Sequence, residues 1–372
     1  MSVQITGIEP SVVKVNHRGD WVMVQIHTTT GHTGLGEASH SGNDALLVAF
    51  VRELSDRLRG RDPQEINMLC APAFAMGLGK VQRTAWSAIE QALWDLKGQA
   101  LGAPIHALFG GAVRKRIRLY ANINRSVRER RPQGFAAAAR AAVAEGFTAV
   151  KLAPFDQVSA PDRVRSGPRA AWQAGVACVL AVREAIGPDV ELMVDCHGRF
   201  DEAEAEQVAL ALSEAALTWF EEPVPDSQPD ALAALSARLP MATASGEHLF
   251  GWQEFMPFIS RPVVDVLMPD VKHDGGLQVT RQVAEAAAAR GRLIAPHNPS
   301  GPVAMAATGQ VASSLGKLMF VEYAWGEVPW RHTLLEPPEQ IEGGDLLISD
   351  RPGLGHRLNA EVLAQHGGQI RL

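Results

Sequence analysis

Acidic and histidine residues recur at nearly constant intervals through the second half of the chain. Each stands at the end of a short apolar run, and the intervals between five of them are 26, 26, 23 and 27 residues: Asp195, Glu221, Glu247, Asp270 and His297. Any one of these acids could be an exposed loop residue. Three carboxylates at matching positions would repel one another unless a cation lay among them, and hard oxygen ligands favour Mg²⁺ or Mn²⁺ over zinc. We therefore predict a metal site formed by Asp195, Glu221 and Glu247.

Two histidines could move protons beside this site. A carboxylate that accepts a hydrogen bond from one imidazole nitrogen raises the basicity of the other nitrogen. Asp270 and His297, in MPD and APHNP, form such a candidate pair, with His297 as the general base. His197 follows Asp195 by two residues, and in an extended segment residues i and i+2 point to the same side. His197 could therefore reach the site from the opposite flank and donate a proton.

Three further charged residues have more than one interpretation. Lys151 ends a predicted interior strand, where a lysine is costly unless it is paired; it could act as a base or as a counter-charge. Glu322 ends the last predicted strand and could hydrogen-bond an anionic oxygen if protonated, or be structural. Glu222 follows Glu221 and should face the other side of the strand. His40, His248 and His273 are interpreted as structural or left without a role.

The elements that must position these residues alternate regularly from about residue 115. Eight short apolar runs predict strands, at 117–120, 149–152, 190–194, 217–220, 241–244, 263–268, 292–295 and 318–321. Helical stretches lie between several of them, at 134–144, 172–185, 202–215, 229–238 and 280–290. Eight such strands over ~225 residues fit a closed (β/α) barrel, whose working residues lie at the carboxyl ends of the strands. An open doubly wound sheet is less favoured, because no strand is followed by a glycine-rich nucleotide fingerprint.

The residues outside the barrel predict a smaller α+β domain. Alternation in 11–15 and 21–26 around a turn at 16–20 predicts a hairpin, and 33–37 a further strand. Helical periodicity marks 45–58 and 81–97, with Leu93 and Trp94 facing inward and Asp95 outward or capping. We thus expect an α+β capping domain at 1–114, a modified TIM barrel at 115–340, and a segment at 341–372 that returns to the capping domain.

Composition excludes several classes of protein. The chain has 372 residues and a formal charge of −6 with no basic block, which argues against a nucleic-acid partner. No run is long and apolar enough for a membrane span, and the first residues do not resemble a signal peptide. Three cysteines without metal or redox spacing argue against a disulfide scaffold or a zinc ribbon. We expect a cytoplasmic globular enzyme.

The motifs around these residues resemble the enolase superfamily, specifically its mandelate racemase subgroup, over nearly the whole chain. The stretch AIEQALWDLKG at 88–98 resembles the helical signature before the barrel, and the strand ends VD, FEEP and SGE around Asp195, Glu221 and Glu247 resemble its three metal-ligand positions. The muconate-lactonizing branch typically has Lys in the region of Asp270, so Asp270 and His297 favour the mandelate racemase side. The resemblance implies a capping domain built from both chain ends, a modified barrel and a required Mg²⁺.

One departure from the family pattern bears on the reaction. The second barrel strand of the family often ends Lys-x-Lys, and the second Lys serves as the other base in racemization; here Ala153 stands in its place. The run Asp195-Cys196-His197-Gly198-Arg199 is instead similar to the Asp-x-His-Gly-Arg of galactonate-type sugar-acid dehydratases, in which the His is implied to expel the leaving hydroxyl.

The resemblance therefore implies a Mg²⁺-dependent acid-sugar dehydratase. A proton α to a carboxylate is very weakly acidic, and a divalent cation stabilises the charge that its removal leaves. His297 would take this proton and His197 would protonate the β-hydroxyl as it leaves, giving a 2-keto-3-deoxy acid.

Two other functions stay open from the sequence. The same scaffold could serve an epimerase, racemase or cycloisomerase of a carboxylic acid, or, with lower expectation, a binding protein without activity. The expected partner is a small carboxylate, with specificity set by loops at 15–21 and 73–80 that include His17, Arg18 and Trp21. The family's preference for symmetric oligomers implies a homo-oligomer. The sequence does not identify the acid or its stereochemistry.

Overall fold

The first third of the chain folds as an antiparallel sheet covered by helices. The computed structural model describes residues 3–74, 77–158 and 168–368. The elements of this part are β1 (Ile5–Asn16), β2 (Gly19–Thr28), β3 (Thr33–Glu37), α1 (Asp44–Leu58), α2 (Ile66–Cys70), the 3₁₀ turn η1 (Ala71–Phe74), α3 (Lys80–Leu101) and α4 (Ile105–Leu108). The predicted hairpin and both long helices are confirmed. Asn16 pairs with Gly19, so the turn between β1 and β2 is tighter than expected.

Eight parallel strands form the barrel, and all eight were predicted. They are β4 (Arg116–Asn122), β5 (Ala149–Leu152), β6 (Glu191–Asp195), β7 (Trp219–Glu221), β8 (Thr243–Ser245), β9 (Val266–Leu267), β10 (Leu293–Ile294) and β11 (Val321–Ala324). Neighbours in the chain pair in order from β4 to β10, and β11 pairs with β4. The Met319 amide donates to the Ile294 carbonyl at 2.8 Å and so closes the ring between β10 and β11.

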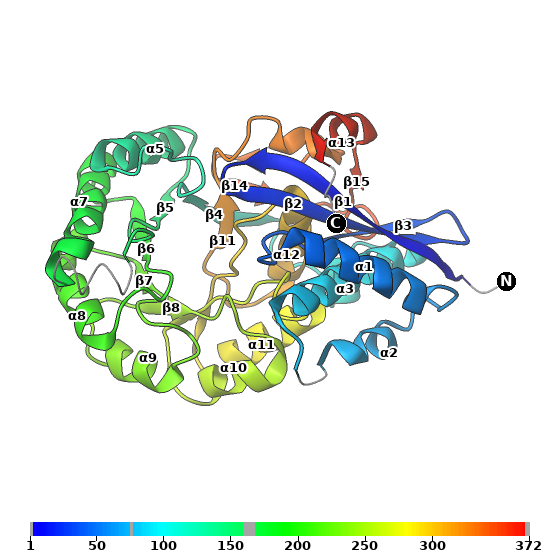
Figure 1. The fold of residues 1–372 in the computed structure, drawn as a ribbon, viewed down its shortest axis with the longest axis horizontal. Coiled ribbons are helices and arrows are strands. Elements are labelled where there is room, and N and C mark those ends of the chain that lie inside the picture. The colour runs from blue at the N-terminus through cyan, green and yellow to red at the C-terminus, as the bar shows by residue number, and fades with distance from the viewer. Residues whose placement is uncertain (1–2, 75–76, 159–167, 369–372) are drawn as a thin grey trace.

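Helices from the described parts of the chain surround the barrel (Figure 1). They are α5 (Pro132–Ala144), α7 (Pro168–Ile186), α8 (Glu202–Ala211) with the turn η2 (Ser213–Ala215), α9 (Pro229–Ser236), α10 (Gly251–Ser260), α11 (Leu277–Ala289) and α12 (Pro302–Ser314). Periodicity did not predict α10 or α12. Pro257 lies inside α10, and α12 is buried on nearly all sides, so it lacks the polar face that gives an amphipathic period. The modified barrel with a capping domain is confirmed.

The last part of the chain contacts both domains. It contains η3 (Arg331–Leu334), β12 (Leu335–Glu336), β13 (Ile341–Glu342), β14 (Asp345–Leu347), β15 (Arg357–Leu358), α13 (Ala360–His366) and β16 (Gly367–Gly368). β14 pairs with the first half of β4, whereas β16 pairs with β1 of the capping sheet. No helix in the described ranges is long and apolar enough to cross a membrane.

The barrel interior is filled by one layer of side chains immediately below the predicted functional residues. Each of the eight strand segments contributes to this floor layer, which contains both bulky and small residues: Tyr120, Ala149, Met193, Trp219, Ala244, Val266, Met268, Ala295 and Phe320. Since alternate residues of a strand face the same way, the residue two positions further along also points inward. These positions include Lys151, Asp195, Glu221, Asp270 and His297. The floor therefore sets the direction of the site residues.

Buried carboxylates of the capping domain hold the two domains together. Glu37 accepts the Gly301 amide at 2.7 Å and the Ala304 amide at 2.8 Å, which satisfies the start of α12. Glu90 caps α11 in the same way, through the amides of Leu277 and Gln278. Barrel helices thus depend on acids supplied by the other domain.

Asp95 corrects a prediction. It was expected to face outward or cap its own helix, yet it is completely buried. Its carboxylate accepts the Leu35 amide at 2.9 Å and the Leu354 amide at 2.7 Å, and so joins β3 to the C-terminal segment. Burial raises the pKa of Asp95 to about 7. Helical period alone could not identify this role, because both partners are distant in sequence.

We predict that Glu37→Gln lowers the free energy of unfolding by about 1–3 kcal/mol, because an amide NH₂ replaces one acceptor and leaves a buried backbone N–H unpaired. Urea denaturation followed by circular dichroism measures this. Glu53→Gln, in an exposed i,i+4 pair with Arg57, is the control and should change stability by less than about 0.5 kcal/mol. Equal stability of the two variants would contradict the interdomain role of Glu37.

Candidate active site

Three carboxylates meet at the carboxyl ends of β6, β7 and β8. Asp195 and Glu221 are the last residues of their strands, and Glu247 follows β8. One ligand oxygen from each lies within 4.8 Å of the others, and all three residues are buried. Glu247 stands three residues after the floor residue Ala244, whereas Asp195 and Glu221 each stand two residues after theirs. Gly246, with a φ of 117°, bends the chain so that Glu247 still reaches the group.

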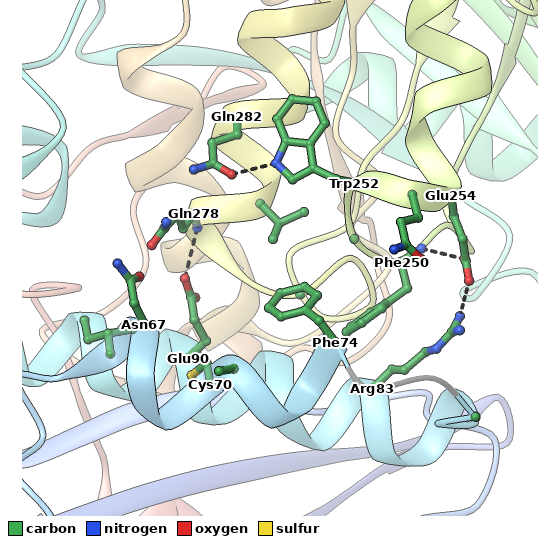
Figure 2. Close-up of a pocket in the computed structure, with 17 residues that line it drawn as sticks. Asn67, Cys70, Phe74, Arg83, Glu90, Phe250, Trp252, Glu254, Gln278 and Gln282 are labelled. Atoms are coloured by element: carbon green, nitrogen blue, oxygen red, sulfur yellow. Dashed lines mark hydrogen bonds and ion pairs between the residues drawn. The ribbon is translucent and has the colours of Figure 1, made fainter.

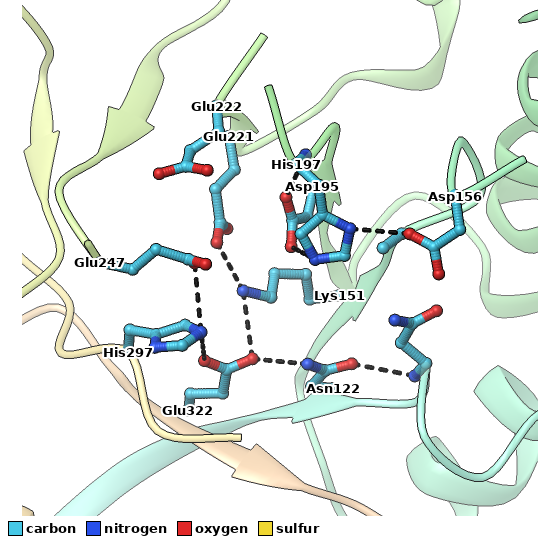
Figure 3. A network of polar contacts seen from close by, with 12 residues as sticks. Asn122, Lys151, Asp156, Asp195, His197, Glu221, Glu222, Glu247, His297 and Glu322 are labelled. Carbon is cyan, nitrogen blue, oxygen red and sulfur yellow. Dashed lines mark hydrogen bonds and ion pairs between the residues drawn. The ribbon is translucent and has the colours of Figure 1, made fainter. Parts of the chain in front are cut away.

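Lys151 is the counter-charge of this group. Its Nζ lies 2.7 Å from Glu221 Oε1 and 3.1 Å from Glu322 Oε1, in the centre of the network (Figure 3). Burial alone would lower the pKa of Lys151, but the charges of Glu221 and Glu322 outweigh it and raise the pKa well above its usual range. Lys151 is therefore protonated. Of its two interpretations, these ion pairs favour the counter-charge.

The residues present fit a divalent cation. Their donors are three buried carboxylates, the hard oxygen ligands that Mg²⁺ and Mn²⁺ prefer. Trp219, in the floor layer, donates its indole N–H to Glu221 Oε2 at 2.9 Å and orients that carboxylate. One lysine cannot neutralise three acids, so a cation would remove the remaining repulsion.

His297 lies on one side of the carboxylate group. Its Nδ1 is 2.7 Å from Asp270 Oδ2, and its Nε2 is 3.1 Å from Glu247 Oε2. The predicted Asp–His pair is thus present, with Nε2 facing the candidate metal ligands. Burial would raise the pKa of Asp270, but the Lys272 ammonium outweighs this effect and holds the pKa well below its usual range. Asp270 is therefore an ionised acceptor for the imidazole N–H.

Lys272 was missed from the sequence. It is fully buried and forms an ion pair with Asp270. A turn brings it there. The Lys272 backbone amide donates to the Asp270 side chain, and the Asp274 backbone amide donates to the Asp270 carbonyl. The available signal was a lysine two residues after the predicted acid, in the run MPDVK.

His197 lies on the opposite side of the group from His297 (Figure 3). The expectation that it reaches the site is met, but the reason given for it was wrong. His197 is not extended; its φ is 49°, and its amide donates to Asp195 Oδ1 at 2.8 Å. This left-handed turn, followed by Gly198, directs the imidazole toward Asp195 Oδ2, which lies 2.8 Å from Nε2.

Asp156 fixes the orientation of His197 and was also missed. Its Oδ1 lies 2.7 Å from His197 Nδ1, while its Oδ2 pairs with Arg130 at 2.9 Å and Arg18 at 3.2 Å. Burial would lower the pKa of His197, but the charge of Asp195 and the hydrogen bonds that the imidazole donates to Asp156 and Asp195 raise it well above the usual range. The site therefore holds two Asp–His pairs, one on each side. The loop after β5 carries no motif that predicts Asp156.

Glu322 does not fit the protonated role considered from the sequence. Its Oε1 accepts the Asn122 amide group at 2.6 Å and its Oε2 accepts the Asn298 backbone N–H at 2.9 Å. Burial would raise its pKa, but Lys151 and His297 outweigh burial and lower it. Glu322 is thus an ionised acceptor that positions Lys151.

Glu222 was expected to face away from Glu221 on the strand. It lies beyond the end of β7 in a left-handed conformation, with a φ of 39°. Its carboxylate is within reach of Glu247 and His248.

A small pocket of about 150 Å³ opens onto the two histidines, Asp195 and Glu247. Three histidines that were given no chemical role in the sequence, His40, His248 and His273, line it. Arg18 and Lys80, from the two loops expected to set specificity, line it as well. Trp21 does not; it is completely buried and packs against Trp330. Of the second loop, Ala75 and Met76 lie outside the described residues.

A larger cavity of about 670 Å³ lies elsewhere, between the capping helices and the barrel helices α10 and α11 (Figure 2). Phe74, Phe250 and Trp252 form much of its wall. Its lining includes none of the candidate metal ligands and neither histidine of the two pairs. The smaller, polar pocket is therefore the candidate active site.

Family models agree with this arrangement. Residues 5–110 match the mandelate racemase/muconate lactonizing enzyme N-terminal domain, and residues 134–362 match the enolase C-terminal domain-like family. The chain belongs to the mandelate racemase/muconate lactonizing enzyme family of the enolase superfamily. In this family the two matched domains are the capping domain and the barrel described above.

Relatives in the enolase superfamily cover almost the whole chain. The D-galactonate dehydratase of Ralstonia nicotianae is 33% identical over 90% of this chain and 88% of its own length. The D-xylonate dehydratase of Haloferax volcanii is 29% identical over 98% of this chain and 89% of its own. The crystal structure of a mandelate racemase/muconate lactonizing enzyme from Jannaschia sp. CCS1 superposes with a TM-score of 0.87, at 28% identity and 99% coverage of both chains.

We predict that Asp195→Asn, Glu221→Gln and Glu247→Gln each weaken Mg²⁺ binding by more than about 100-fold, beyond the 10–100-fold typical of residues that only support a ligand. Isothermal titration calorimetry with Mg²⁺ measures this. Glu202→Gln, an exposed acid on α8, is the control and should bind Mg²⁺ as the unmodified protein does. Unchanged affinity in the three site variants would rule out this metal site.

Proposed function

We propose that this protein is a divalent-metal-dependent sugar-acid dehydratase that converts its substrate to a 2-keto-3-deoxy acid. The observation that carries the proposal is the presence of two Asp–His pairs on opposite sides of one buried carboxylate group. Relatives named D-galactonate and D-xylonate dehydratase support the substrate class.

Each histidine would move one proton. His297 Nε2 takes the proton α to the substrate carboxylate, and the electrons of the broken C–H bond form a carbon–carbon double bond as the β C–O bond breaks. The His197 imidazolium gives its proton to the departing hydroxyl, which leaves as water. The enol product then tautomerises to the 2-keto acid.

Asp195, Glu221 and Glu247 would hold Mg²⁺ or Mn²⁺ in this reaction. The bound cation supplies positive charge that stabilises the anion formed when the α-proton is removed. Lys151 and Glu322 keep the carboxylates in place through the ion pairs described above. A second base on the Lys151 strand is missing, because Ala153 has no group that can move a proton. This favours elimination over two-base racemization.

We predict that His297→Asn abolishes both α-proton exchange and product formation. His197→Asn should retain α-proton exchange, while its dehydration rate should fall by at least about 100-fold, within the range of general acid–base effects. Proton NMR in D₂O follows the α-position, and a keto-acid reagent follows the product. Full turnover in the His197→Asn variant would refute the acid assignment. Deuterium uptake without keto product from the unmodified protein would favour an epimerase or cycloisomerase.

Asp156→Asn should slow dehydration by about 10- to 100-fold, because an amide can present N–H to His197 Nδ1 and misorient the ring. The rate of α-deuterium exchange, which depends on His297, should stay within about threefold of its original value. Asp62→Asn, at a half-buried position of the capping domain where one carboxylate oxygen accepts the Gln64 amide, serves as the matched control. Equal losses in exchange and dehydration would show that Asp156 supports the whole site rather than His197.

A further inference from the structure

The cations that line the active-site pocket differ in whether an acid neutralises them. Arg18 pairs with Asp156, Arg125 pairs with Glu327, and Lys272 pairs with Asp270. Lys80 also lines the pocket, but among the described residues no carboxylate lies within ion-pair distance of it and it makes no side-chain hydrogen bond. Its charge is therefore available to something that enters the pocket.

Lys80 reaches the pocket from the capping domain. It is the first residue of α3, whose first turn contains no acidic residue, so that turn offers the ammonium no ion-pair partner. Lys80 is exposed to solvent, yet partial burial lowers its pKa, and this effect outweighs the nearby carboxylates of Glu247 and Asp270. An anion bound there would relieve the cost of this partly desolvated cation.

The two ends of the pocket thus suit two different groups. The carboxylate next to the α-proton must lie at the buried end, where the candidate metal ligands and His297 are. Asn124, only 4% exposed, lines the pocket with an Oδ1 that has no hydrogen-bond partner and could accept from a substrate hydroxyl. Lys80 lines the same pocket and is exposed whereas those residues are buried, so it lies toward the solvent side of the pocket. A volume of about 150 Å³ limits the substrate to a compact molecule.

We propose that Lys80 is a specificity residue that binds a second, terminal carboxylate, so that the substrate is a sugar diacid rather than a sugar monoacid. This inference rests on the proposed dehydratase function and goes beyond it, because relatives are named for the monoacids galactonate and xylonate. A terminal CH₂OH would leave the ammonium unpaired, whereas a carboxylate would form a charge-assisted hydrogen bond with it.

The test compares matched substrates that differ only at the terminal carbon: D-galactonate with galactarate, and D-xylonate with xylarate. With Mg²⁺ present, the unmodified protein should show a kcat/KM for the diacids about 10- to 100-fold above that for the monoacids, within the range of a charged hydrogen bond. Lys80→Met should reduce this ratio by a similar factor, mainly through KM for the diacid. Lys80→Arg should keep most of the diacid preference. Lys317→Met, at an exposed site, is the control and should leave the ratio unchanged.

A preference for the monoacids, or equal effects of Lys80→Met on both members of a pair, would overturn the inference. If neither series gives a keto acid, the proposed dehydratase function fails instead. Titration calorimetry of the same pairs against the Mg²⁺-loaded protein then decides the role of Lys80. Tighter binding of the diacid that is lost in Lys80→Met supports the role, and equal binding of diacid and monoacid overturns it.

Discussion

Repulsion among buried carboxylates is the constraint on which the site depends. Five acids that face the barrel mouth are almost completely buried: Asp195, Glu221, Glu247, Asp270 and Glu322. Burying one unpaired charge is expensive, and burying five is tolerable only with counter-charges. Lys151 and Lys272 supply two of them, each by direct ion pairs. The remaining excess of negative charge lies where the three candidate metal ligands meet, and this is why a divalent cation fits there.

The floor of the barrel turns this electrostatic requirement into a geometry. Side chains such as Met193, Trp219 and Ala295 fill the interior, and the strand period of two then points the next inward residues at the same small volume. Histidines at two edges of that volume are each held by an aspartate. In the proposed reaction, one histidine would supply a basic nitrogen and the other an acidic N–H, on opposite sides of a carboxylate group that would stabilise negative charge once it held a divalent cation.

The capping domain contributes to stability and to recognition through different residues. Its buried acids, such as Glu37 and Glu90, satisfy the first turns of barrel helices and tie the domains together. Arg18 and Lys80, from two loops of the same domain, line the pocket. Arg18 is tied to the His197 side of the site through Asp156, whereas Lys80 forms no ion pair with a described residue and is the one whose replacement would leave the ion pairs of the site intact.

The sequence alone determined the features that follow from local period and spacing. All eight barrel strands, the three acids of the candidate metal site and the residues of the Asp270–His297 pair could be identified, since strand ends recur about every 25 residues. Tertiary structure decided what depends on contacts between distant segments. Asp156 reaches His197 across 41 residues, and Asp95 reaches Leu354 across 259. It also decided charge states, because burial and partners determine that Lys151 is a counter-charge and Glu322 an acceptor. Local period gives the direction of a side chain, but only the fold gives its neighbours, and the neighbours set its chemistry.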